Sequence, residues 1–362
     1  MSATLSEAGF HLRASLGGWG IWIAFGLLLF MGLAGSFVHV VAHAEGPLVP
    51  HPELLTGQIG EFFYLIIVFV VAGFAGAIMR RDDRLGFDQI LAVAPAPLYV
   101  RVLGKTLAAF ALTLIFCSLP LLAGYSVTLL AAPTSFAPTL PLVYFGLAYA
   151  PALFEVCGFV VLAHAVFRGA GAAHTFAMLG AFIIVLNSEL GLVTYPPAKF
   201  GVPPHVSFSE LDGVWPWLTM LFTSGLFKCG LALLTTAFAW LVWPSEWVDT
   251  WVGGLRLMRA RLWGEASLHL FGSCLIVVAL GSVLHTQHVE RGGYMSASQE
   301  EALEARWEKR WLQHADAFEV DGGDVMMHVD PEARMVRSVW QIHGVVAERA
   351  LHGELPSGVQ VI

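Results

Sequence analysis

Charged residues are scarce in this sequence, and that scarcity decides its class. Asp, Glu, Lys and Arg together make up 13% of 362 residues, whereas hydrophobic residues make up 57% and the mean hydropathy is +0.70. Soluble domains carry about 25% charged residues, so the composition excludes a soluble domain from the first three quarters of the chain. The formal net charge of −8 comes largely from the C-terminal region, and we expect no nucleic-acid partner.

Cysteine is also rare. The four cysteines, Cys117, Cys157, Cys229 and Cys274, all lie inside long apolar runs. We expect them to be small buried apolar residues, since none lies in the C-terminal region where a disulfide could stabilise a small exported module. No paired-cysteine metal motif is present.

Two catalytic signatures are missing as well. Residues 103–106 read Leu-Gly-Lys-Thr, but Tyr99 stands where a phosphate-binding loop requires its first glycine. The His-Glu-x-x-His sequence of a zinc peptidase does not occur. We therefore predict no catalytic residue, no metal or other cofactor bound by this chain, and no enzyme activity of its own.

Long apolar runs are what the sequence has instead. About 20 helical residues cross a hydrocarbon core, and seven runs are long enough: 17–41, 59–79, 105–131, 142–167, 172–191, 215–243 and 267–285. The first lacks the cleavage site of a signal peptide, so we expect it to be retained. The predicted fold class is an all-α integral membrane protein: a helical bundle of six spans in residues 1–265, a seventh span at 266–285, and a small extracytoplasmic α+β tail at 286–362.

The distribution of Lys and Arg predicts the orientation. Loops at 42–58 and 132–141 contain neither residue, and the loop at 192–214 contains only Lys199. The opposite side holds Arg13, Arg80, Arg81, Arg84, Arg101, Lys105, Arg168, Arg256, Arg259 and Arg261. By the positive-inside rule the N-terminus is cytoplasmic, and seven crossings would place the C-terminus outside the cytoplasm.

The most informative stretch is the charged segment at residues 80–105, RRDDRLGFDQILAVAPAPLYVRVLGK. From Asp82 onward, apolar residues recur with approximately helical spacing as far as Val93, and Pro95 and Pro97 then stop the pattern. This predicts a short helix lying along the membrane surface. An ordinary solvated loop that obeys the positive-inside rule is the alternative.

The order of residues in this segment resembles the permease subunits of type-2 ABC exporters. A basic pair, acidic residues, a glycine, Ile-Leu, Ala-Pro and Leu-Gly-Lys lead into a span, and the matching positions are Arg81, Gly86, Ile90, Leu91, Pro95, Gly104 and Lys105. Phe87-Asp88 departs from the Glu and the Thr or Ala that the family usually has near the glycine. An amphipathic helix expected at residues 5–15 adds to the likeness.

The resemblance implies a function and partners. In that family the segment is the coupling helix, which docks on a cytoplasmic ATPase in a separate chain. The docking residues so implied are Arg80, Arg81, Asp82, Asp83, Arg84, Gly86, Gln89, Ile90, Leu91 and Pro95. ATP and magnesium would bind that ATPase, a second permease copy or a homologous permease would complete the pathway, and the setting would be the bacterial cytoplasmic (inner) membrane. The alternative function is a membrane anchor or assembly scaffold that positions an extracytoplasmic partner through the tail.

Ionisable residues inside apolar runs mark packing or transport sites because burying them is costly. Glu155 lies midway along the fourth run, Lys228 midway along the sixth, and Glu189 near the outer end of the fifth. A structural pair between Glu155 and Lys228, a role along a substrate path, and no contact between them are all open. Outer-side histidines at positions 39, 43, 51, 205, 285 and 288 match no closed metal site by their spacing, and a solvated loop is the alternative.

The outer loop and the tail narrow the resemblance to one subgroup. The sequence PHVSFSELDGVWPWL resembles type-2 permeases fused to a zinc peptidase-like domain of the aminopeptidase N type; the matching positions are Ser207, Glu210, Leu211, Asp212 and Gly213. A charged helix at 297–312 containing Trp307-Glu308-Lys309-Arg310, and a β-hairpin at 317–329 and 333–346, agree with that subgroup. Without the zinc motif no peptidase activity is implied, and we expect either a module completed by a partner or the remnant of a lost domain.

Overall fold

The computed structural model describes residues 2–44, 52–87, 97–131, 139–167, 169–204, 215–243, 251–264, 266–311, 318–330 and 335–346. The chain forms two compact units, Met1–Tyr294 and Met295–Ile362. The first is helical and contains the membrane-length helices, and in the second the structure describes a helix and a β-hairpin.

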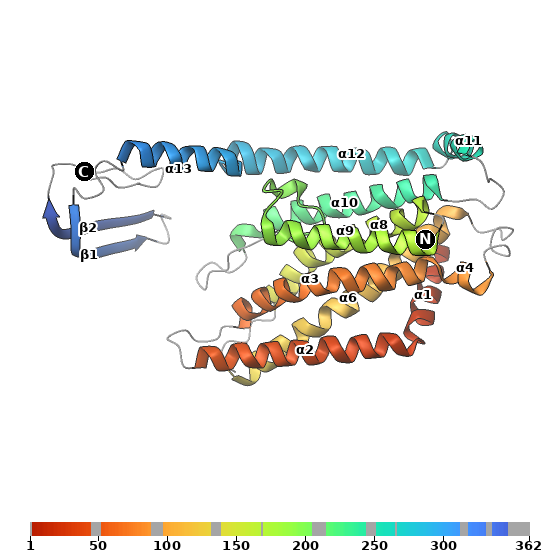
Figure 1. The fold of residues 1–362 in the computed structure, drawn as a ribbon, viewed down its shortest axis with the longest axis horizontal. Helices are drawn as coiled ribbons and strands as arrows, with labels where there is room; N and C mark the ends of the chain where they lie inside the picture. Colours follow the sequence, from red (N-terminus) through yellow and green to blue (C-terminus); the bar gives the residue numbers. More distant parts are fainter. Residues whose placement is uncertain are drawn as a thin grey trace. The chain divides into compact units, whose positions relative to one another are not determined.

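The first unit is a bundle of long helices with short helices at its ends (Figure 1). Its α-helices are α1 (Ser2–Leu16), α2 (Trp19–Ala44), α3 (Pro52–Met79), α4 (Arg81–Leu85), α6 (Leu98–Ala131), α7 (Thr139–Tyr144), α8 (Ala150–Val166), α9 (Ala170–Leu190), α10 (Leu218–Val242), α11 (Trp251–Leu262) and α12 (Ala266–His285). Single turns of π-helix, η2 (Phe145–Tyr149) and η5 (Thr286–Arg291), and of 3-10 helix, η3 (Pro196–Ala198) and η4 (Trp215–Trp217), complete it. The η2 turn joins α7 to α8 in one continuous helical run.

Helix length and apolarity identify an all-α membrane protein. Six helices of the described chain are long and apolar enough to cross a bilayer: Trp19–Val38, Leu98–Val127, Leu142–Val166, Ala170–Asn187, Leu218–Val242 and Ser267–Arg291. They confirm six of the seven predicted runs as membrane-length helices. The remaining run, at 59–79, lies in α3, where the apolar stretch among described side chains is Tyr64–Met79, shorter than a crossing needs. The count of seven spans stays a prediction.

Helix α8 lies at the centre of the packing. Most of its residues are buried, and it packs against α3, α6, α9 and α10. Glycine permits the close approach: a Cβ added to Gly158 of α8 would lie 2.3 Å from the Thr235 hydroxyl oxygen of α10. Likewise, a Cβ at Gly32 of α2 would lie 2.7 Å from the Pro120 Cα of α6. Small residues at helix crossings are what van der Waals packing within a membrane requires.

The charged segment differs from its prediction. Instead of running on past Leu85, α4 ends there, because Gly86 adopts the left-handed conformation with φ +70° and donates its N–H to the Asp83 carbonyl. This is a glycine C-cap, and it stops a helix whatever the apolar spacing beyond it. The prediction of one uninterrupted surface helix is therefore wrong at Gly86. Residues 88–96 lie outside the described part of the chain.

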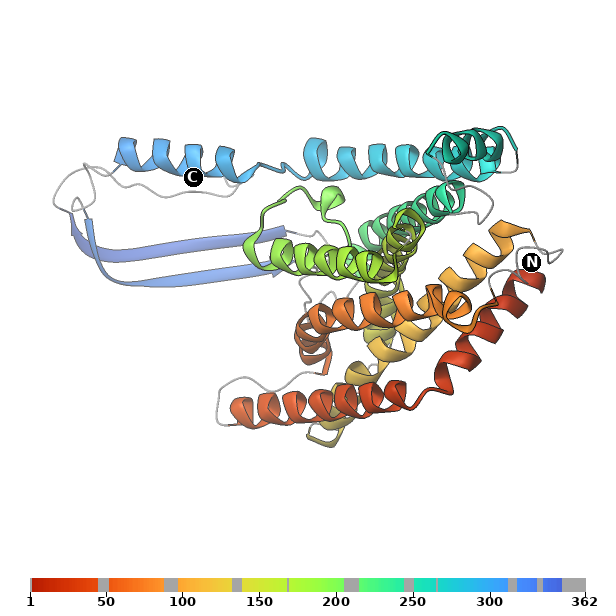
Figure 2. The same cartoon turned by 45° about the vertical axis from the view of Figure 1, so that its right-hand side comes forward.

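Helices α1, α4 and α11 gather at one end of the first unit, which we name the α4 end (Figures 1 and 2). Helix α9 begins at the α4 end, directly after α8. The segment 191–204, which follows α9, lies at the opposite end of the unit, which we name the loop end. The positive-inside rule assigns the α4 end to the cytoplasm, and that orientation stays a prediction.

The second unit contains α13 (Ala297–Trp311) and the antiparallel strands β1 (Phe318–Asp330) and β2 (Met335–Val346). The register runs from Asp330 opposite Met335 to Phe318 opposite Val346, with an irregularity between Val320 and Gly322. The strands form a two-stranded sheet. The location of this unit outside the cytoplasm stays a prediction.

Candidate functional site

A buried arginine fixes α4 to the bundle. Arg80, at the junction of α3 and α4, is 8% exposed. One guanidinium nitrogen pairs with the Asp83 carboxylate at 2.8 Å, and another donates to the backbone carbonyls of His164, at 3.3 Å, and Phe167. Because those carbonyls end α8, Arg80 links the start of α4 to the end of the central helix.

A second ion pair joins α4 to α6. Lys105 Nζ lies 2.7 Å from Asp82 Oδ2, with both side chains largely buried, and it also donates to the Met79 carbonyl at 3.3 Å. The ammonium lies 5.7 Å from the centre of the Trp243 ring, within the range of a cation–π contact. The predicted docking segment is therefore closed on itself, because its first acidic residue, Asp82, pairs with its last residue, Lys105.

Helix α1 packs against the same place. A Cβ added to Gly104 of α6 would lie 2.7 Å from Glu7 Cγ, so the two helices touch at this glycine. The Arg81 guanidinium lies 5.6 Å from the centre of the Phe10 ring. The amphipathic helix predicted at 5–15 thus forms part of the α4 end and contacts both α4 and α6.

A buried histidine of α1 lies within this charge cluster. His11 is 1% exposed and its Nε2 is 3.3 Å from Glu7 Oε1. Burial lowers the pKa of His11 below its ordinary value, and the positive charge of Lys105 lowers it further, whereas Asp82 and Glu7 act in the opposite direction. The neutral imidazole is therefore favoured in the folded protein.

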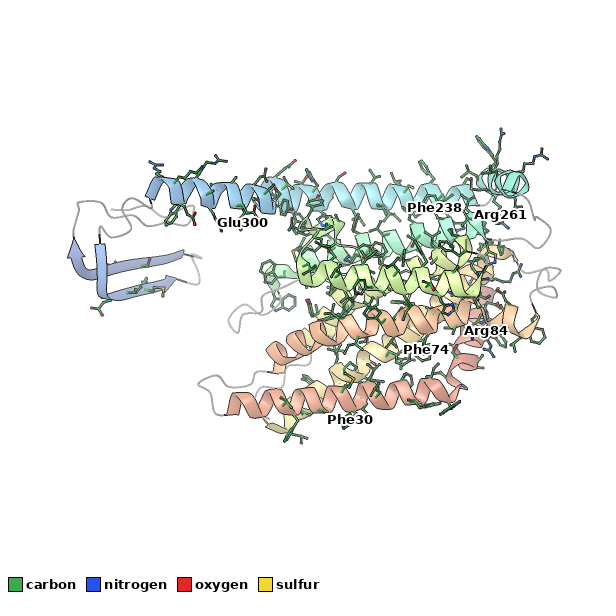
Figure 3. The ribbon with its side chains drawn as sticks, viewed as in Figure 1. Phe30, Phe74, Arg84, Phe238, Arg261 and Glu300 are labelled. Atoms are coloured by element: carbon green, nitrogen blue, oxygen red, sulfur yellow. The ribbon has the colours of Figure 1, made fainter. Side chains whose placement is uncertain are left out.

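The outward face of the α4 end combines apolar and charged side chains. Leu85 and Phe87, on either side of Gly86, are 55% and 50% exposed. Asp83 and Arg84 are exposed beside them, and Figure 3 shows the Arg84 side chain at this end. Two large apolar side chains with adjacent charges make a surface suited to a protein partner.

Helix α11 adds basic residues at this end. Arg256 and Arg259 are exposed, whereas Arg261 donates to the carbonyls of Trp240, Leu241 and Trp243 at 3.2, 3.1 and 2.7 Å and so caps α10. Burial lowers the pKa of Arg261 from its ordinary value.

The structure divides the predicted docking residues by role. Arg80 and Asp82 are buried and hold α4 in place, and Arg81 is half-buried against α1. Asp83, Arg84 and Gly86 are exposed. Gln89, Ile90, Leu91 and Pro95 lie outside the described residues. Sequence reasoning missed Leu85 and Phe87 as surface residues, because an apolar residue in a membrane protein is ordinarily assigned to the buried or lipid-facing side.

The structure brings Glu155 and Lys228 together inside the bundle. Lys228 Nζ is 3.0 Å from Glu155 Oε2, and the side chains are 4% and 0% exposed. The same carboxylate oxygen accepts the Gly201 N–H at 2.9 Å, and Lys228 also donates to the Lys199 carbonyl at 3.0 Å. A structural pair, one of the three open alternatives, is therefore what the structure contains.

The segment 191–204 reaches from the loop end into the bundle to meet this pair. Gly201 is buried with φ +64°, and a Cβ there would lie 2.9 Å from Ile184 Cδ1, so both conformation and space demand glycine. The Tyr64 hydroxyl donates to the Gly201 carbonyl at 2.5 Å, and the Tyr144 hydroxyl donates to the Pro204 carbonyl at 2.9 Å. The sequence predicts only an outer loop here. How deep this segment enters the bundle was missed, and the one available signal is a glycine between Phe200 and Val202.

Where their side chains are described, the other predicted polar residues form no common site. Glu189 lies in the last turn of α9, and its side chain lies outside the description. Within the described residues no group of three His, Cys, Asp or Glu side chains could hold a metal ion. His285 instead pairs with the Tyr195 hydroxyl at 3.0 Å, and at the α4 end His164 and His174 meet at 3.2 Å, a pair that sequence reasoning missed.

Comparison of the chain with protein-family profiles, with curated proteins and with solved structures finds no match. Function therefore has to be argued from the α4 end and from the buried pair.

Proposed function

We propose that this chain is the transmembrane subunit of an ABC-type exporter, in which the α4 end docks on a separate cytoplasmic ATPase. The likeness to type-2 ABC permeases over residues 80–105 supplies the class of partner. The observation that carries the proposal is that an exposed surface, Leu85 and Phe87, is tied to α6 by the buried Lys105–Asp82 ion pair and to α8 by hydrogen bonds of the buried Arg80 side chain.

The ion pairs suit force transmission. Arg80 connects α4 to the end of α8, and Lys105 connects it to the start of α6. A partner that moves α4 would have to move α3, α6 and α8 with it, because breaking these contacts separates the buried Lys105 and Asp82 charges and leaves the buried Arg80 guanidinium short of acceptors. In the proposal, ATP and magnesium bind the partner ATPase, and its closure shifts these helices together.

The rest of the proposed architecture follows from this function. Helix α3 completes a seventh span, the N-terminus lies in the cytoplasm of a bacterial cell, and the second unit lies outside its cytoplasmic membrane. A second permease copy or a homologous permease pairs with this one to enclose the pathway.

The test is association with an ABC ATPase encoded beside this gene, co-expressed with the full chain and purified through it. Phe87→Asp is expected to weaken association roughly thirtyfold, the equivalent of about 2 kcal/mol for a central apolar contact. Leu192→Asp is the matched control, since Leu192 is 64% exposed at the loop end. Lys105→Met, which alters no exposed side chain, is expected to preserve association and reduce transport per ATP hydrolysed.

Equal association of the Phe87→Asp and Leu192→Asp variants with the ATPase would refute docking at the α4 end. Absence of any ATPase in the complex would favour the second candidate function, a membrane anchor that positions a partner through the second unit. One observation supports that candidate: Val325, Met326 and Met327 of β1 are successive and exposed, so both faces of the hairpin present apolar side chains. A two-stranded sheet gains independent stability only when another surface packs against it.

A further inference from the structure

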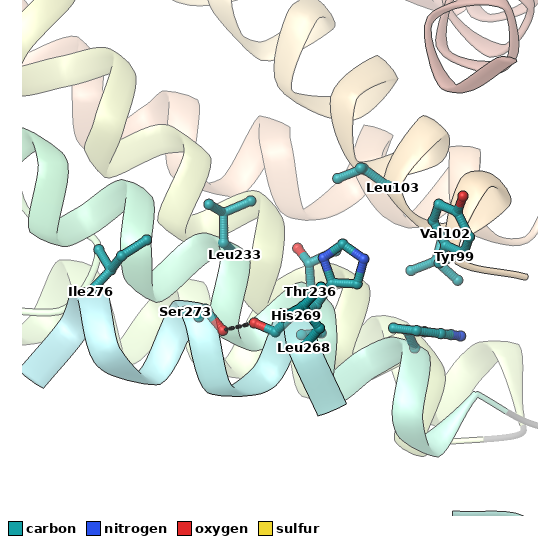
Figure 4. Close-up of a pocket in the computed structure, with 12 residues that line it drawn as sticks. Tyr99, Val102, Leu103, Leu233, Thr236, Leu268, His269, Ser273 and Ile276 are labelled. Atoms are coloured by element: carbon teal, nitrogen blue, oxygen red, sulfur yellow. Dashed lines mark hydrogen bonds between the residues drawn. The ribbon is translucent and has the colours of Figure 1, made fainter. Parts of the chain in front are cut away.

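A cavity of about 260 Å³ lies between α6, α10 and α12 toward the α4 end (Figure 4). Its walls are mostly apolar, and one part is aromatic: the rings of Tyr99, Trp240 and His269 lie 5.7 to 5.9 Å apart, centre to centre. The volume is below that of a typical pocket for a drug-sized molecule. It therefore fits one slender apolar chain rather than a bulky ligand.

One polar atom in the wall is unusual. Thr236 lines the cavity, is 5% exposed, and its hydroxyl oxygen has no hydrogen-bond partner among the described residues. Two other intramembrane hydroxyls donate to carbonyls of their own helix: Thr223 to Thr219, and Ser273, also in this wall, to His269 at 2.7 Å. A buried hydroxyl without a partner is costly, so Thr236 indicates an acceptor atom on whatever fills the cavity.

The cavity lies at membrane level. His269 is the third residue of the span Ser267–Arg291, and Ile276, also in the wall, lies about 10 Å deeper along α12. Leu268 and Ile276 are 74% and 42% exposed, so the cavity opens on the outer surface of the helical unit. An occupant would enter from the hydrocarbon of the bilayer.

Basic residues of α11, near the membrane boundary, indicate the charge of the occupant's headgroup. Helix α11 contacts both α10 and α12, and its Arg256 and Arg259 are exposed. Basic side chains at the membrane boundary attract anionic lipid headgroups. From the surface inward there are thus the positive charges of the neighbouring α11 and then, in the cavity wall, aromatic rings, a free hydroxyl donor and aliphatic side chains.

We infer that this cavity binds one acyl chain of an anionic glycerophospholipid. The Thr236 hydroxyl donates a hydrogen bond to the ester carbonyl, the chain runs inward past Leu233 and Ile276, and the phosphate faces α11. The inference stands on the cavity and is independent of the proposed transport function.

Photolabelling of the full-length chain in lipid vesicles tests the site. The probe is phosphatidylglycerol with a photoactivatable diazirine on one acyl chain, and labelled peptides are mapped by mass spectrometry. Labels are expected to concentrate on the cavity segments of α10 and α12. Gly272→Leu should reduce that labelling at least roughly tenfold, since Gly272 lines the cavity and its Cβ position is open, so the new side chain fills the cavity without striking the backbone.

Gly26→Leu in α2 is the matched control, because its Cβ position is equally open and lies on a different, exposed helix face. Thr236→Val, which keeps the shape and removes the donor, should reduce labelling about fivefold, the equivalent of one hydrogen bond of about 1 kcal/mol. Thr223→Val on the same helix should leave it unchanged.

Equal labelling in the Gly272→Leu and Gly26→Leu variants would overturn the inference. So would labels that are spread evenly over the exposed faces of α2 and α12. A third contrary result would be labelling by a diazirine fatty acid that excess phosphatidylglycerol does not displace. Equal labelling by phosphatidylcholine and phosphatidylglycerol probes would refute the anionic headgroup. None of these readouts requires an ATPase, so failure here and failure of the proposed function are separate outcomes.

Discussion

Replacing Lys228 with Met is expected to destabilise the helical unit by about 3–5 kcal/mol, the cost of leaving one charge of a buried pair without its partner. The pair is well placed for a large effect, because the Glu155 side chain is 0% exposed and water cannot replace the ammonium. The Gly201 N–H would be the remaining donor to the carboxylate oxygen, 2.9 Å away. One neutral donor compensates only part of a buried charge.

The double variant Glu155→Gln/Lys228→Met separates charge from packing. The glutamine carbonyl oxygen can still accept from Gly201, and no charge remains, so the expected loss falls to about 1–2 kcal/mol for the unpaired Lys199 carbonyl. Adding Glu155→Gln to Lys228→Met is then expected to recover about 2–3 kcal/mol. Because both substitutions nearly preserve side-chain size, rescue of the single variant by the second substitution would report on charge rather than on volume.

The assay is equilibrium denaturation in mixed micelles, followed by the reaction of a fluorescent maleimide with buried thiols. Cys117 and Cys157 are free and buried, so they report on opening of the bundle. The reasoning is refuted if Lys228→Met costs under about 1 kcal/mol, or if the double variant is as unstable as the single.

Three further perturbations probe the α4 end. Burial lowers the pKa of His11 below its ordinary value of 6.5, so below pH 6.5 the unfolded chain binds more protons than the folded protein does. The stability that is present above that pH is therefore lost as the pH falls through the folded pKa. His11→Gln should flatten the pH profile of thermal unfolding. Gly104→Leu should displace α1 from α6 and raise protease cleavage within α1, with Gly73→Leu, whose Cβ position is open, as the unaffected control. Gly86→Ala should weaken the packing of α4 on the bundle by about 1–2 kcal/mol, because the left-handed backbone at Gly86 is strained for alanine although space is open for its Cβ. Gly86→Asn should cost less, since asparagine adopts that conformation more readily. Equal protease cleavage rates for the two variants would contradict this.

The sequence predicted the local features well, because they depend on neighbouring residues. The length of an apolar run decides whether a helix can cross a bilayer, so six spans are read directly from it. Where local rules compete, prediction fails: the apolar spacing from Asp82 predicts a continuous helix, but the left-handed Gly86 ends it after Leu85. A glycine in a helical pattern tells little until its φ angle is known.

For the charged residues inside apolar runs, the sequence identified the residues but not their contacts. The cost of burying Glu155 and Lys228 identified both as significant, but their separation of 73 residues left contact undecided until the helices were packed. The same holds for Lys105 and Asp82, whose pairing closes the docking segment on itself.

By itself, then, the sequence determined that this is a helical membrane protein with one charged segment set between apolar runs, because composition and periodicity are properties of the chain alone. Tertiary structure decided which charged residues are buried and hold helices together and which are exposed. It also decided how deep Gly201 enters the bundle, and that α6, α10 and α12 leave a cavity beside Thr236. These depend on contacts between residues far apart in the chain, and no local pattern encodes the distance between them.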